Sequence, residues 1–352
     1  MNGSRFEAIT AKYSRLRVAV VGDFCLDRYL EIDPARTETS IETGLPVYNV
    51  TNVRAQPGGA GTVLNNLIAL GVGTIYPVGF AGEDGEGYEL CRALAAKPGV
   101  RLDHFLQTSD RHTFTYCKPL ILEPGKSPRE LNRFDQKNWT PTPPALAGRL
   151  SAAVAAAANA VDALALLGQV DEPETGVLTA GVLATLGAIA QAKPERLILA
   201  DDRRSLRGFP PVIFKMNAAE LAALTGTQPA AAVADIAAVA VGLARQNGRP
   251  VFVTLAERGI VGASPDGQSE HVPSLPVRGE IDIVGAGDSV SANLLAALAA
   301  GATLREAMEL ANLAASIVVH QLGTTGSASV AQLRQLGFGD RQGSSSVINI
   351  KN

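Results

Sequence analysis

The chain has 352 residues, of which 46% are hydrophobic and 18% are charged, and its formal net charge at pH 7 is −3. This length and composition allow a large buried core, which excludes wholesale disorder. The slightly acidic balance excludes the strongly basic face that sequence-independent binding of nucleic acid requires, so no such partner is expected.

In chain order, the alternating patterns predict a strand over residues 17–22, a helix over 62–70, a strand over 74–80, a helix over 86–96, a helix over 145–159, a strand over 162–167, a helix over 175–192, strands over 196–200 and 212–216, a helix over 231–245, a strand over 251–254, and helices over 286–300 and 304–322. Repeated strand–helix units predict an α/β fold of three layers, α/β/α, with a mainly parallel central sheet.

Two stretches break this alternation, residues 29–56 and 113–135, because both are strand-like and neither holds a long helix. They are expected to form either a small sheet, acting as a lid that excludes water from a reaction site, or ordinary edge strands. We expect a single domain over residues 1–340. A polar, Gly/Ser-rich tail over residues 341–352 is expected to be flexible.

The three cysteines, Cys25, Cys91 and Cys117, are widely spaced and match no metal-binding pattern. We therefore expect buried free thiols in a reducing cytosol. No uninterrupted apolar run reaches about 18 residues, so no membrane span is expected, and the polar start of the chain predicts no secretion signal. The expected location is the cytoplasm.

The strongest candidate for chemistry is the run Asp-Ile-Val-Gly-Ala-Gly-Asp, residues 282–288, directly before an expected helix. Gly285 and Gly287, with Ala286 between them, let the backbone approach a ligand closely. Free N–H groups and the positive end of the helix dipole converge there, which favours binding of an anion such as a phosphoryl group. Asp288 could accept a proton from a hydroxyl aimed at that group. Taken alone, the run is equally well explained by an Asp that caps a Gly-rich turn.

Three other segments carry weaker signals. Residues 57–61, Pro-Gly-Gly-Ala-Gly, form a second glycine-rich turn before a helix. Asp23 and Asp27 follow the first strand, where open α/β sheets place their ligands, although a surface turn explains them too. Asn217 and Glu220 follow another strand with the spacing of a capping box.

In their order along the chain, these segments resemble the PfkB, or ribokinase-like, family of carbohydrate kinases. The matching stretches are residues 20–27, 57–59, 78–85, 217–220, 254–259 and 282–288, so the resemblance covers nearly the whole chain. It implies a main sheet with a small β lid, and transfer of the γ-phosphoryl group of ATP to a hydroxyl of a sugar or sugar phosphate. It also implies Mg²⁺ as a cofactor and, in some members, K⁺.

The resemblance implies a role for each matching residue. Asp288 is the expected catalytic base, and the expected anion hole consists of Gly285, Ala286 and Gly287. The candidates for substrate binding are Asp27, Gly58, Gly59, Thr62, Asn66 and Asp171. The candidates for ATP binding are Asn217, Glu220, Thr254, Ala256, Gly259 and Asn312. Glu220 is also expected to hold Mg²⁺ through water. The candidates for a potassium site are Asp282, the carbonyl of Val284, Gly323 and Ser327.

Within the family, residues 45–50, the 57–61 turn and residues 133–135 are most similar to the bacterial heptose-7-phosphate kinase subgroup. Thr62 stands where the family has an Asn, so recognition of the sugar is expected to differ. Ala256 stands where the nucleotide-binding turn usually has a Gly, which is expected to narrow the approach of the backbone slightly. The run Asp-Asp-Arg-Arg, residues 201–204, could bind a substrate phosphate, although a solvated charge run is the favoured interpretation. Because lids of this family often pair, a homodimer is expected.

Two other functions stay open. One is a nucleoside kinase, and the other is a catalytically silent protein of the same fold that binds a sugar or nucleotide. The changes at Thr62 and Ala256 favour the silent protein, whereas Asp288 and its two glycines favour the enzyme. A dinucleotide-dependent oxidoreductase is disfavoured because no Gly-x-Gly-x-x-Gly pattern follows the first strand.

Overall fold

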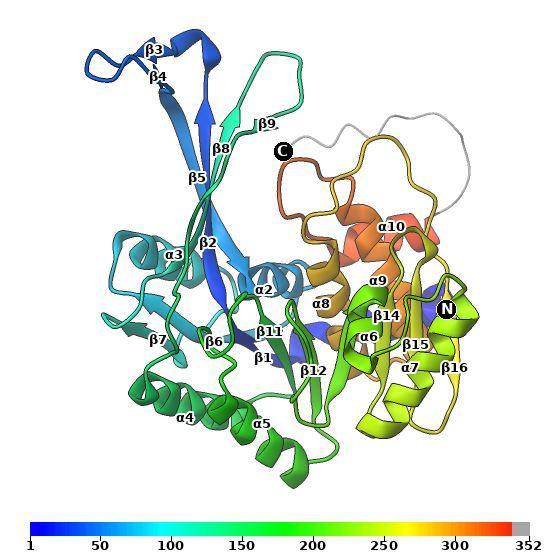
Figure 1. The fold of residues 1–352 in the computed structure, drawn as a ribbon. Coiled ribbons are helices and arrows are strands. Elements are labelled where there is room, and N and C mark those ends of the chain that lie inside the picture. Colours follow the sequence, from blue (N-terminus) through cyan, green and yellow to red (C-terminus); the bar gives the residue numbers. More distant parts are fainter. Residues whose placement is uncertain (340–352) are drawn as a thin grey trace.

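A nine-stranded sheet forms the centre of the computed structural model, which describes residues 1–339 (Figure 1). Its strand order is β16-β15-β14-β13-β12-β11-β1-β6-β7. The bounds are β1 Arg17–Gly22, β6 Thr74–Gly82, β7 Phe105–Thr108, β11 Ala163–Gly168, β12 Leu197–Asp202, β13 Ile213–Asn217, β14 Val251–Thr254, β15 Ile260–Ala263 and β16 Ser269–Val272. All neighbours from β7 to β14 pair in parallel, and β15 and β16 add an antiparallel edge.

Helices cover both faces of this sheet (Figure 1). One face carries α1 Gly3–Thr10, α2 Ala60–Ala69, α3 Gly85–Ala95, α8 Ala286–Ala299, α9 Leu304–Val318 and α10 Val330–Phe338. The other face carries α4 Pro144–Ala160, α5 Ala180–Ala192, α6 Ala218–Thr225 and α7 Val233–Asn247. In β1, Val18 and Val20 pack into the first layer while Ala19 and Val21 pack into the second. Burial on both faces explains why this strand reads as a continuous apolar run.

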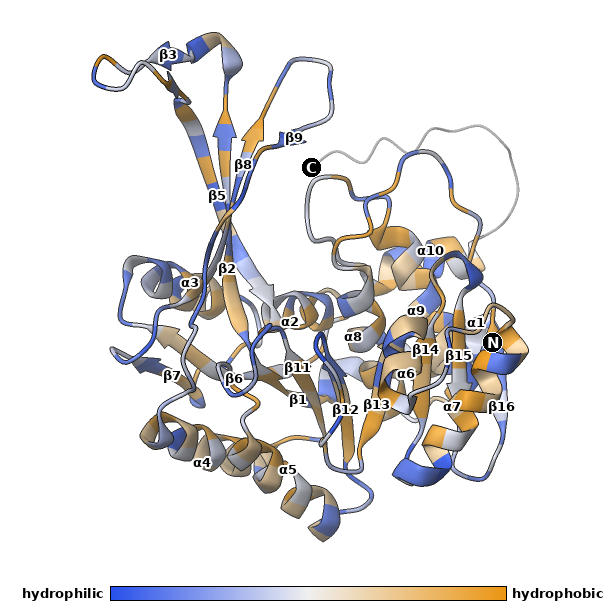
Figure 2. Cartoon of the chain, viewed as in Figure 1, coloured by the Kyte–Doolittle hydropathy of each residue, from blue (hydrophilic) through white to orange (hydrophobic). Residues whose placement is uncertain are grey.

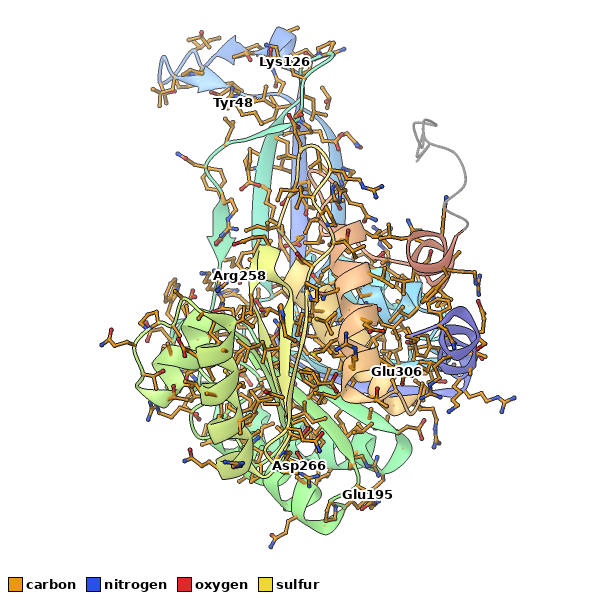
Figure 3. The ribbon with its side chains drawn as sticks, turned by 90° about the vertical axis from the view of Figure 1, so that its right-hand side faces the viewer. Tyr48, Lys126, Glu195, Arg258, Asp266 and Glu306 are labelled. Carbon is orange, nitrogen blue, oxygen red and sulfur yellow. The ribbon has the colours of Figure 1, made fainter. Side chains whose placement is uncertain are left out.

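A second sheet, here called the projecting sheet, extends away from the body (Figure 1). It consists of β2 Phe24–Ile32, β5 Val50–Gly59, β8 Phe114–Ile121, β9 Arg129–Glu130 and β10 Phe134–Gln136. A short hairpin of β3 Glu38–Thr39 and β4 Pro46–Val47 lies at its tip. Figure 3 shows Tyr48 and Lys126 at this tip, while Glu195 and Asp266 lie at the opposite end of the molecule.

The two faces of the projecting sheet differ in chemistry, because paired residues share a face. The register of β2 with β5 and β8 places Asp27, Tyr29 and Lys118 on one face. A bulge in β5 places Val50 and Val53 together on the opposite face, where the pairing of β10 with β8 also puts Phe134. Figure 2 shows the resulting alternation of hydrophilic and hydrophobic residues along these strands.

The structure confirms the predicted α/β/α fold with a small second sheet, and it corrects several boundaries. The helix predicted over residues 175–192 begins only at Ala180, because the side chain of Thr179 caps it by accepting from the N–H of Val182. The sequence reading missed α1, α10 and the antiparallel pair β15–β16. The predicted tail over residues 341–352 lies outside the described residues.

No helix within residues 1–339 has the length and apolar character needed to cross a bilayer. Cys25, Cys91 and Cys117 are free thiols, as predicted. The predicted burial is confirmed for Cys25 and wrong for Cys91 and Cys117, which are partly exposed.

Candidate active site

The predicted anion hole lies where α8 begins. Gly285 precedes the helix with a φ of 81°, which residues with side chains rarely adopt. Within residues 1–339, the N–H groups of Gly287 and Asp288 make no hydrogen bond, whereas the N–H of Ser289 donates to the carbonyl of Gly285. Two free donors at the positive end of a helix are suited to bind an anion.

Asp288 lies in the first turn of the same helix and is half-buried. Loss of hydration raises the pKa of its carboxyl to about 7, and the negative charges of Asp201 and Asp27 raise it further, while Lys215 opposes the shift. A carboxyl with such a pKa can exchange a proton with a substrate near neutral pH. Asp27 and Asp288, which are far apart in the sequence, thus lie close enough in the fold for the charge of one to affect the pKa of the other.

Asp27 lies on β2 and is almost fully buried, with one oxygen 3.3 Å from the ammonium of Lys118 on β8. Burial raises the pKa of Asp27, and Lys118 opposes that rise. A side chain at Gly58 would place its Cβ 2.6–2.8 Å from the Asp27 carboxylate, so glycine is required there. Lys118 was not among the residues predicted for the site. The sequence did offer a signal, because a lysine directly before the apolar end of a strand-like segment is a candidate for a buried cation.

The other acceptor-side candidates lie at the start of α2. Gly59 has a φ of 58°, and a Cβ there would lie 2.4 Å from the carbonyl oxygen of Asp23. Thr62 and Asn66 are buried. The Asn66 amide donates to the carbonyls of Thr62 and Gly326, at 3.0 and 3.3 Å, and thereby ties α2 to the loop before α10. Direct contact of Thr62 or Asn66 with a sugar stays a prediction.

A large cavity of about 610 Å³ lies beside the start of α8. Its lining includes Asn217, Thr254, Ala256, Gly259, Gly287 and Asn312. Five of these are predicted ATP-binding residues, and Gly287 belongs to the predicted anion hole. The volume lies within the usual range for sites that hold a small ligand.

The polar groups around this cavity are well ordered by local hydrogen bonds. Asn217 and Glu220 form the predicted capping box of α6: the Asn217 side chain accepts from the Glu220 N–H at 2.9 Å, and the Glu220 carboxylate accepts from the Asn217 N–H at 2.7 Å. The Asn312 amide donates to the carbonyls of Val272 and Pro273. These contacts fix the cavity wall before any ligand binds.

The turn after β14 keeps its backbone conformation although Ala256 stands where the family usually has a glycine. Ala256 has a φ of 51°, a left-handed conformation that glycine adopts more easily. Gly259 has a φ of 96°, and a Cβ there would lie 2.0 Å from the carbonyl oxygen of Val272. The turn therefore keeps a conformation suited to glycine although an alanine occupies it.

His320 also lines the cavity, and the sequence reading gave it no ligand role. Its Nδ1 lies 2.6 Å from the Ser316 carbonyl, and the N–H of Arg278 donates to its Nε2 at 3.1 Å. Nδ1 must therefore carry the proton, since a carbonyl only accepts. Both ring nitrogens therefore have hydrogen-bond partners within the protein.

The four candidates for a potassium site lie on two loops that meet. The Asp282 carboxylate accepts from the N–H groups of Val284 and Gly323, at 3.0 and 3.1 Å. Ser327 is held in the second loop by paired hydrogen bonds with the Gln321 amide. A cavity of about 580 Å³ separates these loops from Tyr29 and Lys118 of the projecting sheet. Ion binding by the four residues stays a prediction.

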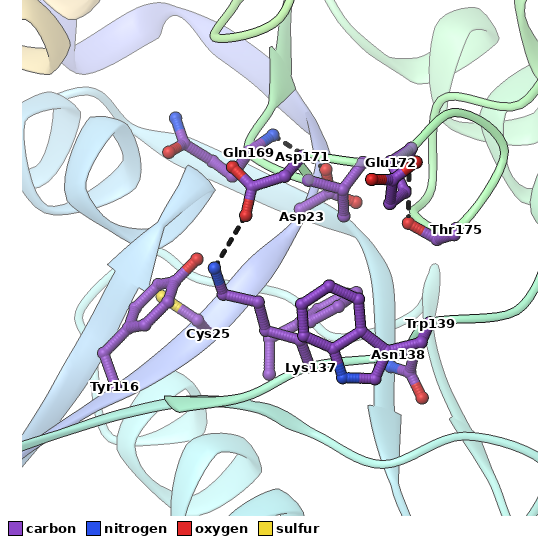
Figure 4. Close-up of a pocket in the computed structure, with 12 residues that line it drawn as sticks. Asp23, Cys25, Tyr116, Lys137, Asn138, Trp139, Gln169, Asp171, Glu172 and Thr175 are labelled. Atoms are coloured by element: carbon purple, nitrogen blue, oxygen red, sulfur yellow. Dashed lines mark hydrogen bonds and ion pairs between the residues drawn. The ribbon is translucent and has the colours of Figure 1, made fainter. Parts of the chain in front are cut away.

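Asp171 lies in a different place, at a small pocket beside β2 (Figure 4). Its carboxylate is 2.7 Å from the ammonium of Lys137, which lowers the pKa of Asp171. The Lys137 ammonium also lies 5.8 Å from the centre of the Tyr116 ring. This pair connects the segment that follows β10 to the loop after β11.

The charge run over residues 201–204 is not simply solvated, so that interpretation was wrong for its two aspartates. Asp202 is buried, and its carboxylate accepts from the N–H groups of Arg204 and Ser205. Asp201 is half-buried and pairs with Lys215 at 2.7 Å. Arg203 and Arg204 are exposed. A local pattern of charges gave no sign of the buried lysine that pairs with the first aspartate.

Comparison with known proteins shows which family and which fold the chain matches. A sequence profile described as pfkB family carbohydrate kinase matches residues 16–331. The bifunctional protein HldE of Azorhizobium caulinodans is 34% identical over 308 residues, which are 87% of this chain and 61% of that protein. HldE of Rhodospirillum rubrum is 33% identical over 317 residues, which are 90% and 61% of the two chains. This chain thus spans less than two thirds of the length of these curated relatives.

Solved structures share the fold. Arabidopsis thaliana ribokinase complexed with ribose and ATP superposes with a TM-score of 0.65 at 19% identity, covering 91% of this chain and 98% of that one. Phosphofructokinase-2 from Escherichia coli in complex with potassium gives a TM-score of 0.66 at 18% identity, covering 91% and 97%.

The raised pKa of Asp288 predicts the pH dependence of any transfer reaction in which it acts as the base. A base must be ionised, so kcat/KM should fall as the pH drops through about 7 and level off above it. Initial rates measured across the pH range, in buffers of constant ionic strength, test this. A profile that stays flat down to about pH 5 would contradict the role of Asp288 as base.

Proposed function

The chain belongs to the pfkB family of carbohydrate kinases, and from this premise we propose that it transfers the γ-phosphoryl group of ATP to a hydroxyl of a sugar phosphate. One observation carries the proposal. Asp288, with a pKa near 7, stands beside two free N–H donors and is coupled to Asp27, at a helix start that borders a nucleotide-sized cavity.

The chemistry assigns one task to each part of the site. ATP lies in the cavity of about 610 Å³ with its γ-phosphoryl group at the N–H groups of Gly287 and Asp288. Asp27 holds a hydroxyl of the acceptor. Asp288 takes the proton of the acceptor hydroxyl while the oxygen of that hydroxyl bonds to the γ-phosphorus. The bond from the γ-phosphorus to the bridging oxygen breaks, and its electron pair stays on the terminal oxygen of ADP.

The donor set suits Mg²⁺ that arrives with the nucleotide. Within residues 1–339, no group of three His, Cys, Asp or Glu side chains is arranged to hold a metal ion by itself. Mg²⁺ usually keeps several waters and is bound by one or two carboxylates together with substrate phosphates. Glu220 would hold it through water, and the ion would neutralise part of the triphosphate charge.

The acceptor side is rich in cations, which favours a substrate that carries a phosphate. Lys118, Arg133 and Lys137 each have a carboxylate partner, at 3.3, 2.8 and 2.7 Å. Arg203 has no ion pair or side-chain hydrogen bond within residues 1–339. Its charge reaches Tyr116, where burial raises the pKa and Arg203 opposes that rise, and Asp171, where Lys137 lowers the pKa and Arg203 adds to the lowering. A free guanidinium is well suited to bind a phosphate.

We take heptose 7-phosphate as the first acceptor to test, because the resemblance to that subgroup rests on residues 45–50, 57–61 and 133–135. The HldE relatives match most of this chain. The substitution at Thr62 is the main reason to include other sugar phosphates. Nucleosides belong in the same panel because a nucleoside kinase is the alternative of the same class.

Asp288→Asn tests the proposed base. An amide cannot take the proton, so kcat should fall by about 10²–10⁴-fold. Binding of ATP should be nearly unchanged, because the N–H donors and the cavity remain. Release of ADP over the acceptor panel gives kcat, and calorimetry gives ATP affinity. Unchanged turnover would sink this assignment, and ATP binding by the wild type with no transfer to any acceptor would support a silent binding protein.

Arg203→Gln tests the phosphate site. Loss of a charge-assisted hydrogen bond should raise KM for the phosphorylated acceptor by about 10- to 100-fold. KM for the same sugar without its phosphate should not change. Arg204→Gln is the matched control, since Arg204 is exposed on the same turn and lies beside Asp202. Equal effects of Arg203→Gln on both acceptors would show that it does not bind the phosphate.

We also propose that the projecting sheet pairs with a second copy of the chain. Its face away from Asp27 and Lys118 exposes Val50, Val53 and Phe134 by 43%, 50% and 68%. Exposed apolar patches of this kind mark interaction sites. Sedimentation should show a dimer that Val53→Lys converts to a monomer, whereas Tyr88→Lys, on the exposed surface of α3, should not. A monomeric wild type at micromolar concentration would contradict the pairing.

A further inference from the structure

Lys215 is a buried cation in the middle of the large sheet. It lies on β13 between Phe214 and Met216, in a strand that is otherwise apolar up to Asn217, and its side chain is 7% exposed. Removing an ammonium group from water is costly unless it is paired and hydrogen-bonded. A lysine at this position therefore requires a reason.

Part of the reason is a carboxylate held from two sides. The Lys215 ammonium lies 2.7 Å from one oxygen of Asp201, and the hydroxyl of Ser291 donates to the same oxygen at 2.7 Å. Ser291 is fully buried on α8 and also lies 3.1 Å from the Gly287 carbonyl. Its single proton serves the shorter contact, because the carboxylate is charged and is the stronger acceptor.

The ion pair with Asp201 does not use all the hydrogen-bond donors of the Lys215 ammonium. A lysine has three donors, and within residues 1–339 Lys215 uses one of them. Two donors of a buried cation are left over, which is unusual in a purely structural ion pair. A structural role alone, in which Lys215 only neutralises Asp201, leaves these donors unexplained.

The spare donors lie at the predicted anion hole. A Cβ at Gly287 would be 3.2 Å from the Lys215 nitrogen, and apart from the neighbouring residues of its own helix it would meet no other heavy atom of residues 1–339 within 4 Å. Because Gly287 has no side chain, the Lys215 ammonium can lie close to the backbone there. The same backbone segment offers the free N–H groups of Gly287 and Asp288. Lys215 also interacts with Asp288 and Glu220 electrostatically.

We propose that Lys215 is a further catalytic residue, which binds an oxygen of the transferring phosphoryl group, and that Asp201 and Ser291 are positioning residues which hold its ammonium at Gly287. The inference rests on the proposed kinase function. Lys215 keeps its proton throughout; Asp288 receives the acceptor's proton, and ADP keeps the electrons of the broken bond. Charge on the equatorial oxygens is then met by three donors, two from the backbone and one from Lys215.

Lys215→Met tests the catalytic role. An interaction that matters mainly in the transition state should lower kcat by about 10²–10³-fold, as for other preorganised donors, and change KM for ATP by less than about 3-fold. The acid limb of kcat should also move to higher pH, because Asp288 loses its nearest cation while the carboxylates of Asp201 and Asp27 remain beside it. The lost charge moves this limb whatever else Lys215 does, so the fall in kcat on the alkaline plateau, where Asp288 is ionised in both proteins, separates a catalytic role from a role in folding.

Ser291→Ala tests the positioning role with little risk to folding. It should lower kcat by about 10-fold, since it removes one hydrogen bond to a charged group. Ser289→Ala is the matched control: Ser289 is buried two residues earlier on the same helix, and its hydroxyl has no partner within residues 1–339. It should leave kcat within about 2-fold, as a hydroxyl without partners contributes little. Thermal unfolding confirms that each variant is folded.

The outcomes separate the two levels of the proposal. A wild type that transfers phosphoryl to no acceptor overturns the proposed function, and this inference with it. A working wild type with a folded Lys215→Met variant of similar kcat overturns the inference alone, as does a variant that changes only KM for ATP. Equal losses in Ser291→Ala and Ser289→Ala overturn the positioning role.

Discussion

Several carboxylates crowd together at one edge of the sheet, and the site depends on nearby cations that compensate their negative charge. The charges of Asp27 and Asp201 both act on Asp288, and the proposed donor would bring the charge of a triphosphate to the same place. Two buried lysines partly neutralise this negative charge: Lys118 pairs with Asp27, and Lys215 pairs with Asp201. Without such cations, burial would keep these carboxyls protonated and unable to act as a base, and those that did ionise would repel an anionic ligand.

The same constraint explains two of the glycines. The space that a side chain would need at Gly58 is occupied by the Asp27 carboxylate, and the space at Gly287 is bordered by the Lys215 ammonium. These glycines are commonly understood as letting the backbone approach a ligand. Here each also makes room for a charged group of the protein, so the glycine turns and the charges form one arrangement.

Much of the fold could be predicted because its signals are local. Buried strands such as β1 appear as continuous apolar runs, and the capping box of Asn217 and Glu220 involves residues three positions apart. The pairs around the site could not be predicted in this way. Lys118 meets Asp27, and Ser291 meets Asp201, only after strands and helices distant in sequence come together. The departure at Ala256 likewise became interpretable only from its φ angle.

The junction of the two sheets has a mechanical consequence. A single residue, Asp23, separates the end of β1 from the start of β2, and its carboxylate is fixed by the N–H groups of Gln169 and Val177. Asp23 therefore anchors the base of the projecting sheet, and Asp27 lies only four residues further along the chain. If the projecting sheet bends, the β3–β4 hairpin at its tip is displaced most, and Asp27, the proposed acceptor-binding carboxylate near the anchored base, is displaced least.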